Sequence, residues 1–343
     1  MNRENKERVG LVTFHSADNF GAVLQTYALS KSLSLLGVEP VIIDGHLSKK
    51  SKSFRSSLRS WLFGLKFKKF RKKYLPEICG LENVENIIVG SDQVWNKDIT
   101  GDSWRHYFGD FKEKKVFSYA ASFGLSQLDE RYQGGETESI LRRYTDISVR
   151  EDNALSMLKL NYNLDATQVL DPTLLLDAEH YGLMLNHSNE KKYLAVFLFN
   201  KNYNRLKAIK NYADEQNLDV DMLNEFRNNI GGKNSRMLSV NSWLTKIKNA
   251  DLIITDSYHC MIFSILFRKR LLVLTANPTR MGRIKSLLRK LGIEKVYKEE
   301  VDNLNDICQV IDDTVDYDSV HSIIKSEREL SIKFLSSAIA RFK

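Results

Sequence analysis

The sequence predicts two doubly wound α/β domains, each with a parallel sheet between layers of helices. Three observations predict this class: short β-rich runs alternate with stretches of helical spacing, the connections between them are short, and polar residues follow several of the apolar runs directly. Strands that alternate with helices form βαβ units, whose successive strands are parallel. A chain of 343 residues is long enough for two domains with a core each.

The first half of the chain opens with one such βαβ unit. Residues 9–14 (VGLVTF) form a β-rich run, and the turn residues HSADNF follow it. Residues 22–36 then place apolar side chains at helical spacing, and Gly37 favours a helix end there. The run EPVIID predicts a second strand that ends at Asp44. Further runs continue this half of the chain: NIIVGSDQVW, KVFSYAASFG, ISVRED and TQVLDPTLLL.

The second half restarts the pattern after a join near residues 176–191. The strand KKYLAVFLFN comes first, and an amphipathic stretch follows over 203–217. After it, SWLTKIKNA is predicted as a helix, DLIITDS as a strand, MIFSILFRK as a helix and RLLVLT as a strand. We therefore predict an N-terminal domain over 1–178 with a basic amphipathic insert at 48–75. The predicted C-terminal domain spans 190–343, and its last helix is expected to pack back on the first domain.

The composition indicates a globular protein of a reducing compartment. Hydrophobic residues make up 43% of the chain and only four residues are proline, which disfavours a disordered chain. No apolar run approaches the roughly 18–20 residues of a membrane span, and the charged start MNRENKERVG is unlike a secretory signal. Cys79, Cys260 and Cys308 offer neither a disulfide framework nor a zinc-binding spacing. We therefore expect a cytoplasmic protein.

The positive charge is concentrated in one segment. The chain carries a net charge of +8, yet residues 48–75 alone hold eleven Lys or Arg and no Asp or Glu, so the remainder carries −3. Apolar residues interleave with these cations at helical spacing: Phe54, Leu58, Trp61, Leu62, Leu65 and Phe67. A basic amphipathic helix of this kind binds an anionic membrane surface; the alternative is a solvated helix packed on the protein. Nucleic acid is not expected, because no nucleic-acid-binding fold accompanies the charge.

Polar residues that directly follow strands are the candidate site, because doubly wound folds bind ligands outside the carboxyl ends of their strands. The first such cluster, FHSADNFGAVLQ, carries Asp18, Asn19 and Gly21 at a strand-to-helix turn. The helix amino terminus could there present free N–H groups to an anion or a sugar. The alternative is that Asp18 or Asn19 only caps the helix.

The second cluster, VGSDQVWN, also follows a strand directly. It holds Asp92, Gln93, Trp95 and Asn96. Carboxylate and amide groups suit sugar hydroxyls, and an indole ring offers an apolar surface on which a sugar can stack. The alternative is a capping turn with a tryptophan in the core.

Two further clusters carry arginine. ISVRED ends a strand with Arg150, whose fork of donors suits a carboxylate or a phosphate. The alternative for this arginine is a salt bridge with Glu151, Asp152 or Asp171. NPTRMGRIKSLLRKLGI places Arg280 and Arg283 in a loop just before a helix, near another potential anion site, and the alternative is a solvated basic loop.

The stretch IITDSYHCMIFS places Ser257, Tyr258, His259 and Cys260 at a strand-to-helix turn. A Cys–His nucleophile is not expected, because nucleophile and base normally meet through space and not as sequence neighbours. Cys260 is therefore expected to be a small buried residue. No metal site is expected, since the other histidines are scattered. His259 is expected to bind an anion or to act as an acid or base.

Taken in order, these motifs resemble the polysaccharide pyruvyl transferase family. The similar segments are distributed in order over most of the chain: TFHSADNFGAVLQTYAL, IIVGSDQVWN, FSYAASFG, ISVREDNA, VLDPTLLL, IITDSYHCMIFSILF and RIKSLLRKLGI. Where the family usually has Ser-Phe-His-Gly, this chain has Ser257-Tyr258-His259-Cys260. The histidine is retained, so the departure concerns local packing more than chemistry.

The resemblance implies that the enolpyruvyl group of phosphoenolpyruvate is transferred to a sugar of a bacterial surface polysaccharide precursor. A pyruvyl ketal forms and phosphate is released, with no cofactor and no metal. The resemblance also implies two Rossmann-like domains that face each other across a cleft, as in GT-B-like enzymes. A donor with a carboxylate and a phosphate needs several cations. The residues expected to supply them are Arg150, His259, Arg280 and Arg283.

Within this scheme, His259 is expected to bind phosphate and to serve as an acid for the leaving group. Asp92 is the expected base of the acceptor half, and Asp18 is a weaker choice. An acceptor on a polyprenyl carrier would place the enzyme on the inner face of the cytoplasmic membrane, with the basic segment 48–75 on the lipid. The alternative is a GT-B-type glycosyltransferase that uses a nucleotide sugar. A non-catalytic binding protein is disfavoured, because it would not need polar clusters after successive strands.

Overall fold

The computed structural model describes most of the chain, and its contacts divide the chain into two compact units. The first unit comprises 1–176 and 325–343, and the second comprises 177–324. The predicted ranges were 1–178 and 190–343, and residues 325–343 group with the first unit, on which the last helix was expected to pack. The described residues are 7–45, 57–133, 135–186, 192–224, 233–234, 237–275, 281–301, 303–311 and 314–342.

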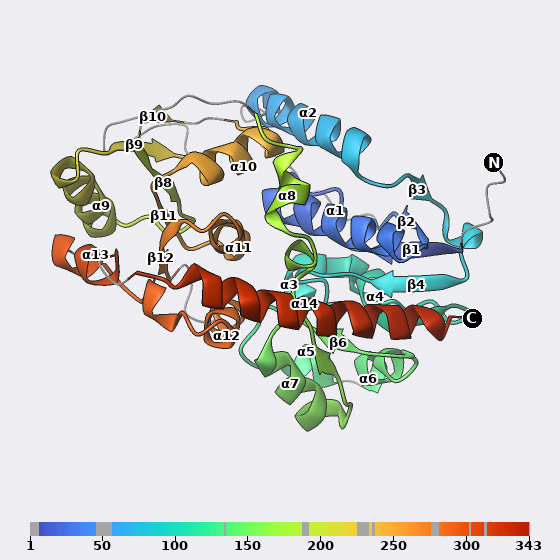
Figure 1. Ribbon diagram of the computed structural model, residues 1–343. Coiled ribbons are helices and arrows are strands. Elements are labelled where there is room, and N and C mark those ends of the chain that lie inside the picture. Colours follow the sequence, from blue (N-terminus) through green and yellow to red (C-terminus); the bar gives the residue numbers. More distant parts are fainter. Residues whose placement is uncertain are drawn as a thin grey trace. The chain divides into compact units, whose positions relative to one another are not determined.

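A five-stranded parallel sheet forms the centre of the first unit (Figure 1), in the order β3-β2-β1-β4-β5. Because β2 and β4 flank β1, the strand order reverses between β1 and β4. Two shorter parallel strands, β6 and β7, form a separate pair. The strands are β1 (Arg8–Val12), β2 (Glu39–Ile43), β3 (Ile78–Cys79), β4 (Asn86–Val89), β5 (Lys115–Ser118), β6 (Ser148–Val149) and β7 (Thr167–Gln168).

Apolar side chains cover both faces of this sheet. Ile87 and Val89 of β4 belong to one apolar cluster, whereas Ile88 between them belongs to another, as expected for a strand whose successive side chains point to opposite faces. The second cluster includes residues of the last helix, such as Leu335. The helices of this unit are α1 (Phe20–Leu35), α2 (Ser57–Tyr74), α3 (Lys97–Thr100), α4 (Trp104–Tyr107), α5 (Glu130–Gln133), α6 (Gly135–Leu141) and α7 (Asp152–Tyr162), with short 3-10 turns at Leu81–Asn83, Gly101–Ser103 and Pro172–Leu174.

The second unit repeats the doubly wound plan with its own parallel sheet. Its order is β10-β9-β8-β11-β12-β13, so the strand order reverses between β8 and β11. The strands are β8 (Tyr193–Phe197), β9 (Asp219–Met222), β10 (Lys233–Asn234), β11 (Leu252–Thr255), β12 (Arg270–Leu274) and β13 (Tyr297–Lys298). Both units therefore have the doubly wound topology that the sequence predicts.

Helices pack on the second sheet around a core of its own. Leu194 of β8, Ile254 of β11 and Leu272 of β12 share one apolar cluster with Ile209 of α9 and Ile307 of α13. All nine residues of α11 are buried. The helices are α8 (Ala178–Gly182), α9 (Tyr203–Glu215), α10 (Val240–Asn249), α11 (Tyr258–Leu266), α12 (Gly282–Lys290), α13 (Leu304–Ile311) and α14 (Tyr317–Ala340), with a 3-10 turn at Glu294–Val296. Helix α14 begins in the second unit and ends in the first.

None of the helices in the described part of the chain combines the length and the apolar character that crossing a bilayer requires.

Candidate functional site

The loops that follow β1 and β4 meet at the point where the first sheet reverses its order. The backbone N–H of Gly90 donates to the carbonyl of Val12 at 2.9 Å, and the Thr13 hydroxyl donates to the carbonyl of Ser91 at 3.0 Å. A Cβ on Gly90 would lie 3.1 Å from the Cβ of Thr13, so glycine allows this close approach. Ligands of doubly wound folds bind at such a switch point, so we take this edge as the candidate site of the first unit.

Arg150 lies in a buried ionic cluster at this edge. Its Nη1 is 2.7 Å from Oδ2 of Asp171, its Nη2 is 3.7 Å from Oδ1 of Asp92, and its Nε is 3.7 Å from Oε2 of Glu151. The Arg150 side chain is only 1% exposed. The salt-bridge alternative therefore describes this arginine, with Asp171 and Glu151 as partners. The expectation that Arg150 is open to an anionic donor needs correction, because three carboxylates already surround its charge.

Hydrogen bonds hold the carboxylates of this cluster in place. The hydroxyls of Ser91 and Thr173 donate to Asp171 at 3.1 and 2.6 Å, and the Ser122 hydroxyl donates to Glu151 at 2.5 Å. A buried network of this kind is costly to leave half satisfied. The cluster therefore fixes the loop after β4, which carries Ser91 and Asp92.

Asp92 adopts a backbone conformation that is unusual for a residue with a side chain. Its φ is 79°, and its Oδ1 accepts a hydrogen bond from the N–H of Gln93 at 2.9 Å. Left-handed non-glycine residues cost about 1–3 kcal/mol and cluster at functional sites. Its side chain is 15% exposed, so Asp92 stays accessible while Arg150 lies behind it. Gln93 is half-buried, and Gly124 leaves room for it, since a Cβ there would lie 2.0 Å from Oε1 of Gln93.

Two other residues of this loop are buried and support the fold. Trp95 is fully buried, with its ring 5.2 Å from that of Phe123 and 5.9 Å from that of Phe108. The expected stacking of Trp95 on a sugar is therefore wrong, and the core-tryptophan alternative is correct. Asn96 is also buried, and its side chain accepts from the N–H of Asp98 at 3.0 Å, which caps α3.

The residues selected in the loop after β1 also have structural partners. Asn19 caps α1, because its side chain accepts from the N–H of Ala22 at 3.1 Å, and Gly21 is buried in the first turn. Asp18 accepts two hydrogen bonds from the guanidinium of Arg71 in α2, both at 3.0 Å. The capping alternative is therefore correct for Asn19. Asp18 is engaged in an ion pair with Arg71.

The structure adds a pair of residues at this edge that sequence reasoning did not select. Nε2 of His15, after β1, lies 3.4 Å from Oδ1 of Asp44, after β2. Burial lowers the pKa of His15, against the raising effects of the Thr13 carbonyl and Asp44. The available signal was the position of both residues just after predicted strands. Sequence alone does not show that the two strands are neighbours.

In the second unit, the start of α11 gathers the residues of the IITDSYHC motif. Ser257 caps this helix, with its hydroxyl 3.5 Å from the N–H of Cys260, and His259 is the second helical residue, 9% exposed. The Tyr258 ring lies 5.4 Å from the His259 ring, and the guanidinium carbon of Arg283 lies 5.6 Å from the Tyr258 ring centroid. A helix amino terminus with a histidine and an arginine close by attracts anions.

Cys260 is fully buried beside His259. Burial raises the pKa of its thiol to about 12, so the thiol stays protonated at neutral pH and is a poor nucleophile. The expectation that Cys260 is a small buried residue is confirmed. Arg280 lies outside the described residues. Among the residues that the structure describes, no group of three or more His, Cys, Asp or Glu is placed to hold a metal ion.

Asp256 connects the two loops at the switch point of the second sheet. Its carboxylate accepts from the backbone N–H groups of Phe199 and Asn200, both at 2.8 Å, and it is 3% exposed. Burial raises the pKa of this carboxyl group, and the two backbone donors lower it. Sequence reasoning did not select Asp256, although it directly follows the strand DLIITDS.

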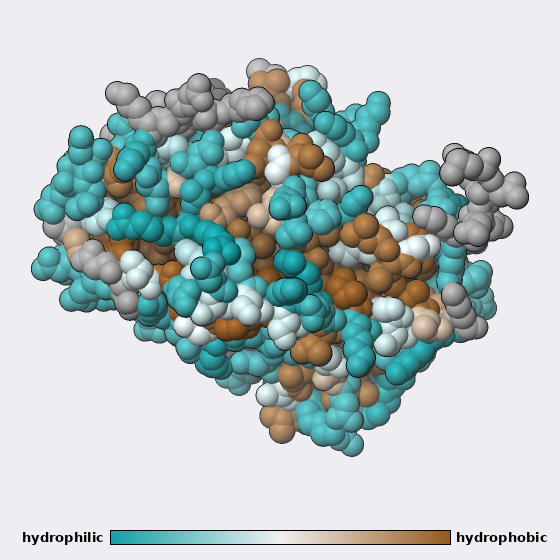
Figure 2. Space-filling model, viewed as in Figure 1, coloured by the Kyte–Doolittle hydropathy of each residue, from teal (hydrophilic) through white to brown (hydrophobic). Residues whose placement is uncertain are grey.

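Helix α2 packs on the first unit with one face and is exposed on the other. Phe67 and Phe70 are buried, and the ring of Phe20 in α1 lies 5.2 Å from that of Phe67. Phe67 is therefore part of the packing face. Figure 2 shows hydrophilic and apolar residues side by side over this helix. We name the exposed side the outer face of α2; it consists of Trp61, Leu62, Leu65, Lys66, Lys68, Lys69, Lys72 and Lys73.

The exposed fractions on this outer face are 59% for Trp61, 41% for Leu62 and 40% for Leu65. The apolar residues come first along the helix and the lysines follow. The packed-helix alternative thus holds for one face only. Phe54 lies outside the described residues, as does the side chain of Leu58.

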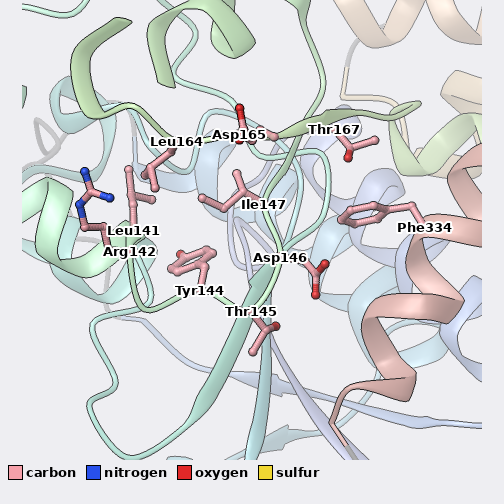
Figure 3. Close-up of a pocket in the computed structure, with 11 residues that line it drawn as sticks. Leu141, Arg142, Tyr144, Thr145, Asp146, Ile147, Leu164, Asp165, Thr167 and Phe334 are labelled. Carbon is pink, nitrogen blue, oxygen red and sulfur yellow. The ribbon is translucent and has the colours of Figure 1, made fainter. Parts of the chain in front are cut away.

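A pocket of about 280 Å³ lies at a different place in the first unit, before the start of β6 and β7 (Figure 3). Asp146 lines it and pairs with Arg341 at 2.7 Å, and burial raises the pKa of Asp146. Tyr144 and Phe334 add aromatic walls. Because this pocket lies at the amino ends of its strands, it is distinct from the edge that carries Asp92 and His15.

The sequence model of the polysaccharide pyruvyl transferase family matches residues 19–278, about three quarters of the chain. The chain belongs to this family. It is an enzyme that transfers pyruvyl groups to polysaccharide. No curated protein sequence matches the chain.

Solved structures of low sequence identity share the fold. S. aureus MnaA with UDP is 15% identical, with a TM-score of 0.54 over 93% of this chain and 90% of that one. UGT89C1 of Arabidopsis thaliana is 11% identical, with a TM-score of 0.52 over 98% and 100%. The UDP-GlcNAc 2-epimerase of Neisseria meningitidis bound to UDP-GlcNAc is 11% identical, with a TM-score of 0.53 over 98% and 100%. These likenesses show the fold alone, and they confirm two Rossmann-like units of the GT-B type.

Proposed function

We propose that this family member transfers the pyruvyl group of phosphoenolpyruvate to a sugar of a bacterial surface polysaccharide precursor. A cyclic ketal forms across two sugar hydroxyls, and phosphate is released. The observation that carries this proposal is the gathering of His259 and Arg283 around Tyr258 at the start of α11. Phosphoenolpyruvate carries a carboxylate and a phosphate, and such a cationic helix terminus suits either group.

In the donor half of the reaction, His259 binds the phosphate and gives it a proton as it leaves. Arg283 adds a fixed positive charge, and Arg280 stays a further candidate from the neighbouring loop. The first-turn N–H groups of α11 contribute to the same attraction. Developing charge on the departing phosphate is thereby stabilised where it appears.

In the acceptor half, Asp92 takes the proton of a sugar hydroxyl and Gln93 contacts a neighbouring hydroxyl. Arg150 acts as a positioning residue, because it holds Asp92 from behind and is not itself exposed. The enol methylene gains a proton, the central carbon gains oxocarbenium character, and the deprotonated hydroxyl adds to it. Loss of phosphate and attack by the second hydroxyl complete the ketal. No oxidation state changes overall, so the proposal contains no redox cofactor.

We also infer that the outer face of α2 binds an anionic membrane surface and that the acceptor is a lipid-linked oligosaccharide. Five lysines lie there with three exposed apolar residues and no acidic residue. At about 1 kcal/mol for each cation near an anionic leaflet, the five lysines supply up to about 5 kcal/mol. Arg71 of the same helix pairs with Asp18 in the loop after β1, which ties α2 to the edge that carries the acceptor groups. The enzyme would then work at the inner face of the cytoplasmic membrane.

The donor is tested by incubating the protein with phosphoenolpyruvate and a panel of lipid-linked and aryl glycosides. Equal amounts of inorganic phosphate and pyruvylated product are expected, and His259→Ala should abolish both. The second candidate is a glycosyltransferase that uses a nucleotide sugar, which the fold likeness to proteins solved with UDP or UDP-GlcNAc favours. Release of UDP or GDP with no use of phosphoenolpyruvate would select that candidate.

Membrane binding is tested by flotation with liposomes of anionic or neutral phospholipid. Replacing the five lysines of the outer face by glutamine should abolish recovery with anionic liposomes. The matched control removes five exposed lysines elsewhere and should still float: Lys112, Lys207, Lys248, Lys325 and Lys333. Equal recovery with neutral liposomes, or equal loss in both variants, would contradict the membrane proposal.

A further inference from the structure

His15 and Asp44 stand at the carboxyl ends of two neighbouring strands of the first sheet. Strand β1 pairs with β2 on one side and with β4 on the other. His15 follows β1, Asp44 follows β2, and Asp92 follows β4. Since all three strands are parallel, the three residues lie at the same edge of the sheet, with Asp44 and Asp92 after the two strands that flank β1.

The hydrogen-bond partners of His15 define its protonation. Nδ1 lies 3.1 Å from the carbonyl oxygen of Thr13, which can only accept, so Nδ1 carries the hydrogen. Burial lowers the pKa of the ring, and the positive charge of Arg71 acts in the same direction. The neutral ring is therefore the resting form at neutral pH. Its Nε2 lone pair faces the Asp44 carboxylate at 3.4 Å, so two proton acceptors face each other.

The proposed reaction needs more than one proton acceptor. A cyclic ketal takes up two sugar oxygens, and each of them loses its hydrogen. Over the whole reaction, the enol methylene gains one proton and the other leaves with phosphate or to solvent. Asp92 alone would have to release the first proton before it could take the second. A second acceptor at the same edge removes this constraint.

We propose that Asp44 and His15 form this second proton acceptor, with Asp44 in contact with one sugar hydroxyl and His15 behind it. This inference rests on the proposed function. The O–H bond of the hydroxyl breaks, and its electron pair forms the new bond to the central carbon of the pyruvyl group. The proton passes to the Asp44 carboxylate and from there to Nε2 of His15. The imidazolium is then stabilised by the Asp44 carboxylate and by the carbonyl of Thr13.

Exposure and basicity favour this order of contacts. The Asp44 side chain is 39% exposed, whereas that of His15 is 3% exposed, so only the carboxylate is open to a sugar. Imidazole is intrinsically the stronger base of the two groups, so the proton comes to rest on His15. A purely structural histidine would need only its bond to the Thr13 carbonyl. The neighbouring Asp44 carboxylate at the strand end is not needed for that purpose.

The charged and titratable groups around the pair come from α2, from the loop after β1 and from α4, whose His106 packs against Gly45, the residue after Asp44. Arg71 of α2 lowers the pKa of His15, and Asp18 pairs with this arginine. Tyr107 of α4 faces Asp44, and burial with the Asp44 charge raises the pKa of this tyrosine, which stays neutral. Tyr107 therefore does not compete with His15 for a proton near neutral pH. Comparison of the wild type with His15→Asn assigns the acidic side of the pH profile to His15.

The experiment compares Asp44→Asn and His15→Asn with the wild type in ketal formation from phosphoenolpyruvate and an acceptor glycoside. Both variants should lose about 10²–10⁴-fold in kcat, with an unchanged KM for phosphoenolpyruvate. In the wild type, kcat should fall as the pH is lowered and His15 becomes protonated, and His15→Asn should lack this decline. The matched control is His180→Asn, which removes a surface histidine 2.8 Å from Asp177 in the second unit; it should keep wild-type kcat.

Wild-type kcat in both variants, or an unchanged acidic decline in His15→Asn, would overturn the inference while leaving the proposed function in place. If the wild type forms no ketal from phosphoenolpyruvate, the proposed function and this inference both fail. Circular dichroism monitors folding of each variant. If His15→Asn does not fold, Asp44→Asn decides the question, because its side chain is partly exposed and tolerates the change.

Discussion

Arg150 offers the clearest quantitative test of the site at the first sheet. Its guanidinium lies among Asp171, Glu151 and Asp92, and the side chains of the first two carboxylates are 0% and 3% exposed. Removing one partner of a buried ion pair costs about 3–5 kcal/mol, because the other charge is left uncompensated. In Arg150→Met, three carboxylates lose the cation that they share. We therefore expect a loss of unfolding free energy at or above the upper end of this range.

The assay is urea denaturation followed by circular dichroism at pH 8 and pH 5.5. The loss of unfolding free energy in Arg150→Met, relative to the wild type, should be smaller at pH 5.5 than at pH 8. Without the arginine, Glu151 and Asp171 bind protons more readily in the folded protein than in the unfolded chain. Such groups cost stability at high pH, and this cost is lost as the pH falls and they become protonated.

Arg143→Met is the matched control, since Arg143 pairs with Asp110 at the surface, where an ion pair contributes only about 0–1 kcal/mol. If Arg150→Met lost no more stability than Arg143→Met, Arg150 would not hold the cluster together. It would then be free to serve as an anion ligand, contrary to its role as the buried partner of three carboxylates. A deficit that grew as the pH fell would equally refute this role.

Three further outcomes follow from the second unit and the core. Cys260→Ser should keep wild-type turnover, and the native thiol should resist alkylation up to about pH 10, because burial raises its pKa to about 12; rapid alkylation at pH 8 would contradict this. Trp95→Phe should lower the unfolding free energy by about 1–3 kcal/mol and leave the KM for the acceptor unchanged, whereas a raised KM would restore the stacking role. Asp256→Ala should remove the acceptor of the Phe199 and Asn200 N–H groups and raise the KM for phosphoenolpyruvate. An unchanged KM would show that this loop does not shape the donor site.

The fold class was predictable because its signals are local. Apolar runs such as VGLVTF and DLIITDS give buried parallel strands wherever they occur, and the polar residues after them mark the binding edge. Strands such as β9 (DVDM) and β10 were not predictable, because they are short and polar and exist only through pairing with β8 and β9. The strand predicted over KVFSYAASFG was too long. Strand β5 ends at Ser118, and Ala120 has a positive φ of 53°, which is incompatible with a continued strand.

The site was predictable in position but not in the role of each side chain. Arg150 and Trp95 fell at the expected strand ends, yet whether each is open or enclosed depends on partners far along the chain, such as Asp171 and Phe123. The amphipathic helix at the basic segment was expected, but its periodicity could not show that Phe67 faces inward. That depends on Phe20 of α1.

The pair of His15 and Asp44 could not be predicted from the sequence either. Each residue follows a predicted strand, and nothing local marks it as reactive. Only the pairing of β1 with β2 brings the two together.

The most direct test of the proposed reaction is the fate of phosphoenolpyruvate labelled with carbon-13 at its central carbon. The protein, the labelled donor and a lipid-linked or aryl glycoside acceptor are incubated together, and the product is examined by NMR and mass spectrometry. We predict that the label appears as a ketal carbon bonded to two sugar oxygens, with one phosphate released for each ketal, and that His259→Ala forms neither. Label that stays in phosphoenolpyruvate while a nucleotide sugar is consumed would contradict the proposed reaction.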